Sequence, residues 1–278
     1  MRARLLPPLL AAALAALGPA SVSQAAPAKA AAKPAAKSRN KPNPAVEQAK
    51  TLLNSGDRAQ IEAGIQSLGL LGTPDAVPPL VERIRAGLAP DLLDTAIVTL
   101  MALGQPTAAP VLFDLSSHRR PEVRLRAIEA VISLAPKGAE DVLRRALSDQ
   151  NASVRSAAAL GLGEIKAVGS LDLLFRALDK GNFEASASIG KLVPGEQLPR
   201  MLSFLGKTPL QSLGPALGEV LVRKDISERD KLAIVSRLQD VGTPEVKSYL
   251  GDLMHLSGDK LPQPVSKAIV QAMQEIVD

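Results

Sequence analysis

A helical unit that recurs about every 31 residues is the feature that most constrains this fold. The clearest two copies begin at Pro121 and Ala152 and read PEVRLRAIEAVISL and ASVRSAAALGLGEI. In both copies apolar residues recur three and four positions apart, which gives a helix an apolar face. Self-similarity with a period of roughly 20 to 50 residues is typical of stacked repeats, because one helix pair cannot bury both of its apolar sides. The pattern therefore predicts an all-α fold built from stacked helix pairs, an α-solenoid.

Four copies of the unit align, and each contains a first and a second helix. The expected helices span residues 60–71 and 75–84, 92–103 and 107–115, 123–134 and 139–147, and 154–165 and 170–178. The alignment places small residues in one column and leucines in another, namely Gly64, Ala96, Ala127 and Ala158, and Leu80, Leu112, Leu143 and Leu174. Small side chains let helices approach closely, and large ones fill the space between pairs. We therefore expect both columns to be buried.

The turn Gly72-Thr73-Pro74-Asp75 has the residues that end one helix and begin another. Glycine ends helices, a threonine oxygen caps them, proline suits a first turn, and aspartate complements the helix dipole. Gly242-Thr243-Pro244-Glu245 repeats this device about 170 residues later, so the helix pattern is expected to resume there.

Between these regions the repeat becomes irregular. Residues 183–192 give only a short first helix, and four prolines are expected to interrupt the register, namely Pro194, Pro199, Pro209 and Pro215. We expect about five to six units within residues 45–278, regular over about 60–180, irregular over 183–215 and resumed over 226–278. A bend or a specific contact is expected first in the irregular stretch.

The phrases beginning Val123-Arg124 and Val154-Arg155 resemble the first helix of HEAT repeats, especially the short bacterial form described as phycobilisome-lyase HEAT-like. The likeness covers about residues 60–180 and recurs near 230–256. It implies a right-handed α-solenoid that binds proteins, and it transfers no lyase residue. HEAT-type alkylpurine DNA glycosylases are a second enzymatic precedent on this fold, but they use a basic groove and aromatic side chains. A slightly acidic body without tryptophan does not match them.

Residues 1–25 are typical of a secretory signal peptide. Arg2 and Arg4 precede an apolar stretch over 5–17, and Ser23-Gln24-Ala25 offers small residues before an expected cleavage at Ala26. The apolar stretch is shorter than the ~20 residues that span a bilayer, which disfavours an uncleaved anchor. The chain has no cysteine, which excludes a lipoprotein attachment site, disulfides and thiolate metal sites. We expect a periplasmic or secreted protein.

Residues 26–44 are rich in alanine, proline and lysine and contain no acidic residue, so we expect a disordered linker. The alternative is a basic tail that holds the protein on a membrane or another anionic envelope surface. Seven of the 33 Lys and Arg residues lie before residue 45 and none of the 28 Asp and Glu residues does, so the body carries 26 positive and 28 negative charges. The sequence pI near 9.5 therefore does not indicate a nucleic-acid partner.

No catalytic residue, metal site or cofactor is expected. His118 and His255 are far apart in sequence and lack carboxylates at ligand spacing, which gives no support to a metal site or a Ser/His triad. Nucleophile-elbow, phosphate-loop and calcium-loop motifs are absent from the sequence.

The candidate protein contacts lie on the expected second helices and are Arg144, Arg145, Phe175 and Arg176. The arginines form either a basic stripe or intrahelical ion pairs, since Glu140, Asp141 and Asp172 each precede one of them by four residues. Phe175 is either a binding anchor or a packing residue.

The expected function is that of a non-enzymatic, exported scaffold or adaptor for another envelope or secreted protein. The sequence leaves the oligomeric state of the scaffold itself open. The alternatives are an envelope tether that binds through the basic linker, and an enzyme of unrecognised type.

Overall fold

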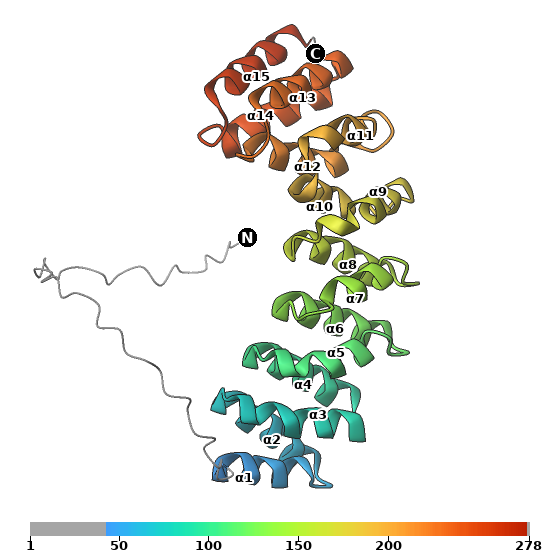
Figure 1. The fold of residues 1–278 in the computed structure, drawn as a ribbon, viewed down its shortest axis with the longest axis vertical. Coiled ribbons are helices and arrows are strands. Elements are labelled where there is room, and N and C mark those ends of the chain that lie inside the picture. The colour runs from blue at the N-terminus through green and yellow to red at the C-terminus, as the bar shows by residue number, and fades with distance from the viewer. Residues whose placement is uncertain (1–42, 277–278) are drawn as a thin grey trace, which may run out of the picture. The chain divides into compact units, whose positions relative to one another are not determined.

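Fifteen α-helices follow one another in residues 43–276, the part of the chain that the computed structural model describes (Figure 1). They are α1 (Pro44–Leu53), α2 (Arg58–Leu71), α3 (Val77–Ala86), α4 (Pro90–Leu103), α5 (Ala109–Leu115), α6 (Pro121–Leu134), α7 (Ala139–Ala146), α8 (Ala152–Glu164), α9 (Leu171–Asp179), α10 (Ala185–Leu192), α11 (Leu198–Leu202), α12 (Leu210–Val222), α13 (Glu228–Val241), α14 (Pro244–Ser257) and α15 (Gln263–Glu275). The only β feature in this part of the chain is one isolated bridge between Leu205 and Thr208. The predicted all-α solenoid is confirmed. The predicted signal peptide and all but the last two residues of the predicted linker lie outside the described residues.

The even-numbered helices from α2 to α12 form a continuous stack in which each helix packs closely on the next (Figure 1). The predicted small column lies within it and is buried, and the predicted leucine column is fully buried beside it. Gly64 of α2 also packs closely on α1, because a Cβ atom there would lie 2.9 Å from the backbone nitrogen of Leu53. The predicted register of the repeats is therefore correct, and the expected helix bounds agree with the observed ones to within a few residues.

The two Gly-Thr-Pro turns differ in one detail. Gly72 and Gly242 both end a helix in the left-handed conformation, with φ of 63° and 61°. The hydroxyl of Thr243 accepts a hydrogen bond from the N–H of Val246 at 3.4 Å, which is the predicted cap. Thr73 makes no such bond, because a 3-10 turn begins there and the N–H of Ala76 bonds to the carbonyl oxygen of Thr73 instead. The predicted cap is confirmed at Thr243 and wrong at Thr73.

Three of the four prolines in the irregular stretch lie at helix ends. Pro194 follows α10, Pro199 is in the first turn of α11, and Pro209 precedes α12. Pro215 lies inside α12, which continues to Val222, so this proline does not end its helix. Helix α11 has only five residues, so the chain returns to the next even-numbered helix without a full second helix between.

Close packing passes from the even-numbered to the odd-numbered helices after α12. Helix α12 packs closely on α10 but loosely on α14, whereas α13 packs closely on α15. The turn at Gly242 joins α13 to α14 as the turn at Gly72 joins α2 to α3, apart from the 3-10 turn. The pairs α2/α3 to α10/α11 and α13/α14 account for the expected units, and α1, α12 and α15 are additional helices.

None of the helices in residues 43–276 combines the length and the apolar composition that crossing a membrane requires.

Candidate protein-binding grooves

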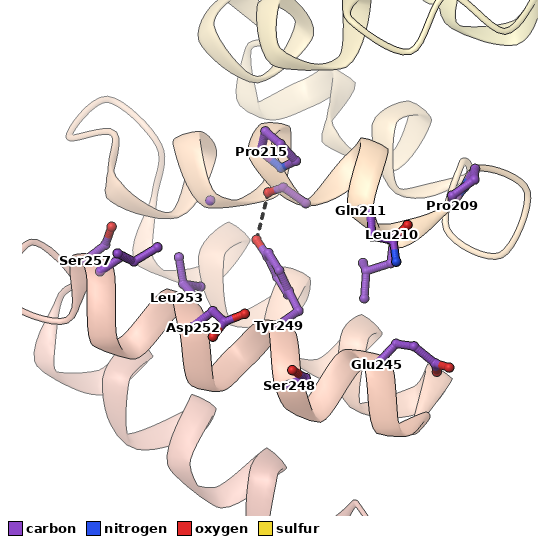
Figure 2. A pocket seen from close by; sticks show the side chains of 13 residues that line it. Pro209, Leu210, Gln211, Pro215, Glu245, Ser248, Tyr249, Asp252, Leu253 and Ser257 are labelled. Carbon is purple, nitrogen blue, oxygen red and sulfur yellow. Dashed lines mark hydrogen bonds between the residues drawn. The ribbon is translucent and has the colours of Figure 1, made fainter. Parts of the chain in front are cut away.

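The loose packing between α12 and α14 leaves a groove of about 830 Å³, here called the α12/α14 groove (Figure 2). Leu210 on α12 and Leu253 and Leu256 on α14 give it an apolar lining. Leu256 is 73% exposed, so it offers apolar surface to solvent at the groove. Apolar surface in a concave site is typical of places where proteins bind ligands or partners.

Tyr249 connects the two sides of this groove. Its side chain extends from α14 to α12, and its hydroxyl donates a hydrogen bond to the carbonyl oxygen of Gly214 at 2.9 Å (Figure 2). A Cβ atom at Gly214 would lie 2.8 Å from Cε2 of the ring, so only glycine leaves room for it. At Gly218, one turn further on, a Cβ atom would lie 3.5 Å from the tyrosine hydroxyl. Tyr249 therefore packs against bare helix backbone.

The opposite side of α12 is packed in a different way. A Cβ atom at Gly190 of α10 would lie 2.6 Å from the Cα atom of Ala216, so backbone lies almost directly on backbone there. Between α12 and α14 the tyrosine ring occupies the space that such contact would close. This difference explains why the α12/α14 groove forms on the side of α12 that faces Tyr249.

The α12/α14 groove is acidic. Glu245 and Asp252 line it together with Tyr249, and no lysine or arginine of residues 43–276 does. The hydrogen bond from the Thr243 hydroxyl lowers the pKa of Glu245, which keeps this carboxylate ionised. Burial raises the pKa of Tyr249, so the phenol stays protonated and remains a hydrogen-bond donor at neutral pH.

A second groove, of about 550 Å³, lies between α7 and α9 and is here called the α7/α9 groove. Its basic lining residues come from three helices and the end of α9, and they are Arg144, Arg155, Arg176 and Lys180. Within the described part of the chain, no aspartate or glutamate lines it. Leu147, Leu173 and Ala177 add an apolar part to the lining.

The structure brings two of the predicted arginine contacts together. Arg144 and Arg176 both line the α7/α9 groove, whereas Arg145 is exposed outside it.

The predicted intrahelical ion pairs are wrong. Among residues 43–276, no ion pair within 4.0 Å joins these arginines to the acids four residues before them. Glu140 instead accepts a hydrogen bond from the Ser170 hydroxyl at 2.7 Å, and Asp172 pairs with Arg200 of α11. The hydrogen bond from Arg200 lowers the pKa of Asp172. The acids are therefore used between neighbouring repeats, which leaves Arg144 and Arg176 to solvent or to a partner.

Phe175 is a packing residue. It is only 1% exposed, and its ring stacks on Phe204 with ring centres 6.0 Å apart. The guanidinium carbon of Arg200 lies 4.1 Å from the centre of the Phe175 ring, so Arg200 also covers this ring. The interpretation of Phe175 as a packing residue is confirmed, and its role as a partner contact is wrong.

Several groove residues were not singled out from the sequence. Arg155 and Lys180 belong to the repeat pattern, and their signal was the 31-residue spacing that separates them from Arg124 and Asp149. Tyr249 carried a signal as well, since it is the only tyrosine in the chain.

Within the described residues, no cluster of three or more histidine, aspartate or glutamate side chains is arranged to hold a metal ion.

A stack of helix pairs with surface grooves defines a repeat protein of the α-solenoid class. The sequence matches HEAT repeats over residues 46–131 and 110–189, which together exceed half of the chain. The chain therefore belongs to the HEAT-repeat family. The predicted HEAT repeats are confirmed, while the narrower phycobilisome-lyase type stays a resemblance. A direct comparison with curated protein sequences finds no match.

Several known structures are similar to this chain at low sequence identity. A chain of the AP-3 complex, from a homology model in an intermediate open conformation, is 17% identical with a TM-score of 0.52, over 84% of this chain and 51% of that one. This chain thus spans about half the length of that relative, and the likeness concerns the fold alone. The complex of CpcE and CpcF of phycocyanin lyase from Nostoc sp. PCC7120 is 18% identical with a TM-score of 0.45, over 88% and 98%. Human deoxyhypusine hydroxylase is 15% identical with a TM-score of 0.40, over 83% and 95%.

Proposed function

We propose that this protein is a non-enzymatic, exported scaffold that binds another protein of the envelope or the secreted space. We infer that the α12/α14 groove is its main docking surface. Repeat proteins of this class generally use their extended surfaces to bind other proteins, which supports the general role. The α12/α14 groove itself is the observation that carries the proposal, because the even-numbered helices before it pack closely on one another.

The lining of the groove favours a particular kind of partner. Leu210, Leu253 and Leu256 suit apolar side chains, and Glu245 and Asp252 suit lysine or arginine beside them. The fitting occupant is therefore a protein segment that carries apolar residues flanked by basic ones. Filling the groove would bury the exposed Leu256 and give α12 the close apolar contact that α14 does not supply.

Export is the second part of the proposal and rests on residues 1–25. The expected mature chain begins at Ala26, and this predicts an N-terminal sequence that can be read by mass spectrometry. A protein that keeps residues 1–25 and stays in the cytoplasm would contradict export.

Site-specific photocrosslinking in the native cell tests the docking surface. A photoreactive residue at Leu256 should give a specific crosslinked protein, identified by mass spectrometry. The matched control is Leu160, which is exposed on α8 but lines neither groove. The same adducts from both positions, or none from Leu256, would contradict docking in this groove.

Deleting residues 26–44 separates the scaffold from the alternative of a tether. A scaffold keeps its crosslink at Leu256 after the deletion. A tether that binds through the basic linker loses its association with the envelope, and the intact tether is extracted by salt.

A further inference from the structure

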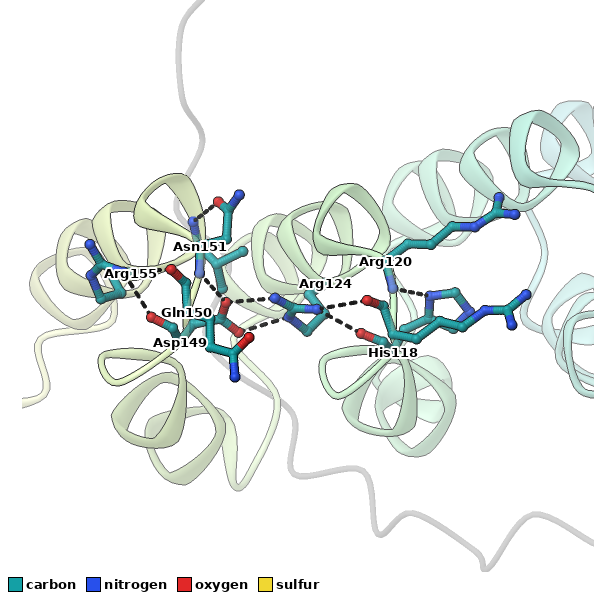
Figure 3. A network of polar contacts seen from close by, with 9 residues as sticks. His118, Arg120, Arg124, Asp149, Gln150, Asn151 and Arg155 are labelled. Atoms are coloured by element: carbon teal, nitrogen blue, oxygen red, sulfur yellow. Dashed lines mark hydrogen bonds and ion pairs between the residues drawn. The ribbon is translucent and has the colours of Figure 1, made fainter.

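Arg124 on α6 and Arg155 on α8 occupy equivalent positions in successive repeats (Figure 3). Each uses its Nη1 atom to bond two carbonyl oxygens in the loop before its own helix. For Arg124 these are the oxygens of His118 at 2.9 Å and Arg119 at 3.3 Å. For Arg155 they are the oxygens of Asp149 at 2.9 Å and Gln150 at 3.0 Å. Both guanidinium groups are therefore held in one orientation relative to the repeat.

The other side of the Arg124 guanidinium binds a carboxylate of the next loop. Nε and Nη2 of Arg124 lie 2.8 Å and 2.7 Å from the two carboxylate oxygens of Asp149, a bidentate pair (Figure 3). The two side chains are 14% and 12% exposed, so the pair is mostly removed from water. The hydrogen bonds from Arg124 lower the pKa of Asp149. This pair shows what the repeat arginine binds when a carboxylate is in reach.

Arg155 lacks this carboxylate. The residue one repeat after Asp149 is Lys180, which lines the α7/α9 groove together with Arg155. Among residues 43–276, Nε and Nη2 of Arg155 make no hydrogen bond and no ion pair within 4.0 Å joins Arg155 to an acid. The charge of Arg155 does act on Asp149, but Arg124 already holds that carboxylate. Arg155 thus has Lys180 at the position where Arg124 has Asp149. Arg144 and Arg176 add two further positive charges to the groove.

We propose that the α7/α9 groove binds an acidic segment of a partner protein. A carboxylate of the segment docks on Arg155 as Asp149 docks on Arg124, and Arg144, Arg176 and Lys180 attract its other acidic groups. Leu147 and Leu173 contact the apolar parts of the segment. This site goes beyond the α12/α14 groove, since the two grooves share no lining residue and each can be tested without the other.

The surroundings favour a protein carboxylate over a nucleic acid. The fork of Arg124 already holds a carboxylate in this same geometry, which an equivalent arginine reproduces. Single-stranded nucleic acids require aromatic platforms on which bases stack, and the lining of the α7/α9 groove contains no aromatic residue. The folded body also carries slightly more acidic than basic residues, which opposes binding of a polyanion over a longer path.

Fluorescence anisotropy with a labelled peptide of alternating leucine and glutamate tests the site. The purified protein should bind this peptide saturably, and salt should weaken the binding. The same peptide with glutamine in place of glutamate should bind at least about tenfold more weakly, the scale of a lost bidentate charged contact. Inorganic phosphate and a short single-stranded oligonucleotide serve as competitors.

Two variants test whether Nε and Nη2 of Arg155 bind a carboxylate of the peptide. Arg155→Lys keeps the charge but loses the bidentate geometry, and it should weaken binding at least about tenfold. Lys180→Asp should supply the missing partner of Arg155 and abolish binding, without lowering the thermal midpoint. The control is Arg145→Gln, which removes a positive charge from α7 outside the groove and should leave binding unchanged.

The proposal is overturned if the Lys180→Asp protein binds the glutamate peptide like the wild type. It is also overturned if the glutamine peptide binds equally well, or if phosphate or the oligonucleotide displaces the peptide and binds more tightly. Circular dichroism checks the fold of each variant. If Arg155→Lys does not fold, Lys180→Asp decides alone, because Lys180 is exposed.

Discussion

The stack from α2 to α10 and the region from α12 to α15 are built from the same kind of helix but bury their apolar faces differently. In the first region, glycine and alanine columns let successive even-numbered helices pack closely. In the second, Tyr249 stands between α12 and α14 and leaves Leu256 open to solvent. The regular repeats thus pack successive even-numbered helices closely on one another, and the departure from the repeat opens an apolar groove between α12 and α14.

The largest effect is expected in the regular stack. Leu143 is fully buried in the leucine column, so Leu143→Ala should lower the free energy of unfolding by about 2 to 5 kcal/mol through the cavity it opens. Leu256→Ala is the matched control in the second region and should change it by less than about 0.5 kcal/mol. Chemical denaturation measures both. Equal losses of unfolding free energy for the two variants would contradict the claim that the two regions bury their apolar side chains differently.

Asp149→Asn should cost about 1.5 to 3 kcal/mol at pH 7, because it leaves Arg124 without its carboxylate. The folded pKa of Asp149 is lowered, so this stabilisation is present above the unfolded pKa of about 4 and is lost as the pH falls through the folded pKa. The difference between wild type and variant should therefore shrink in acid. A difference that stays constant with pH would mean that the pair does not stabilise the repeat.

Tyr249→Phe should cost about 0.5 to 1.5 kcal/mol, the usual contribution of one hydrogen bond, here the one to Gly214. The ring remains and keeps filling the space beside α12. A loss above about 3 kcal/mol in thermal or chemical denaturation would show that the hydroxyl holds α12 and α14 together.

Arg145→Ala should have the smallest effect, below about 0.5 kcal/mol, because Arg145 is exposed and makes no ion pair with the described residues. A larger loss in the same denaturation measurement would assign Arg145 a structural contact.

The fold could be predicted because the repeat columns combine periodicity with residue size. Ala127 and Leu143 are buried as their columns require, and the glycine at position 242 ends a helix as expected. Helix α1 was missed because its unit lacks a preceding copy, and the course of α12 past Pro215 was not foreseen because a helix can continue past a proline.

The grooves were harder to predict. Spacing alone suggested that Arg176 pairs with Asp172, but Arg200 reaches Asp172 from α11, and no local pattern reports such a contact. The role of Phe175 was ambiguous for the same reason, because the ring that packs on it, Phe204, comes from a distant part of the sequence. The groove beside Tyr249 depends on how α12 and α14 pack, which the sequence of either helix does not specify.

Tyr249 fluorescence gives the most direct test of the α12/α14 groove, because the chain has one tyrosine and no tryptophan. A peptide of alternating leucine and lysine, without aromatic residues, should change the Tyr249 emission saturably as it fills the groove. The leucine–glutamate peptide, which is expected to bind between α7 and α9, should leave that emission unchanged. An unchanged emission with the lysine peptide, or equal changes with both, would contradict a partner site between α12 and α14.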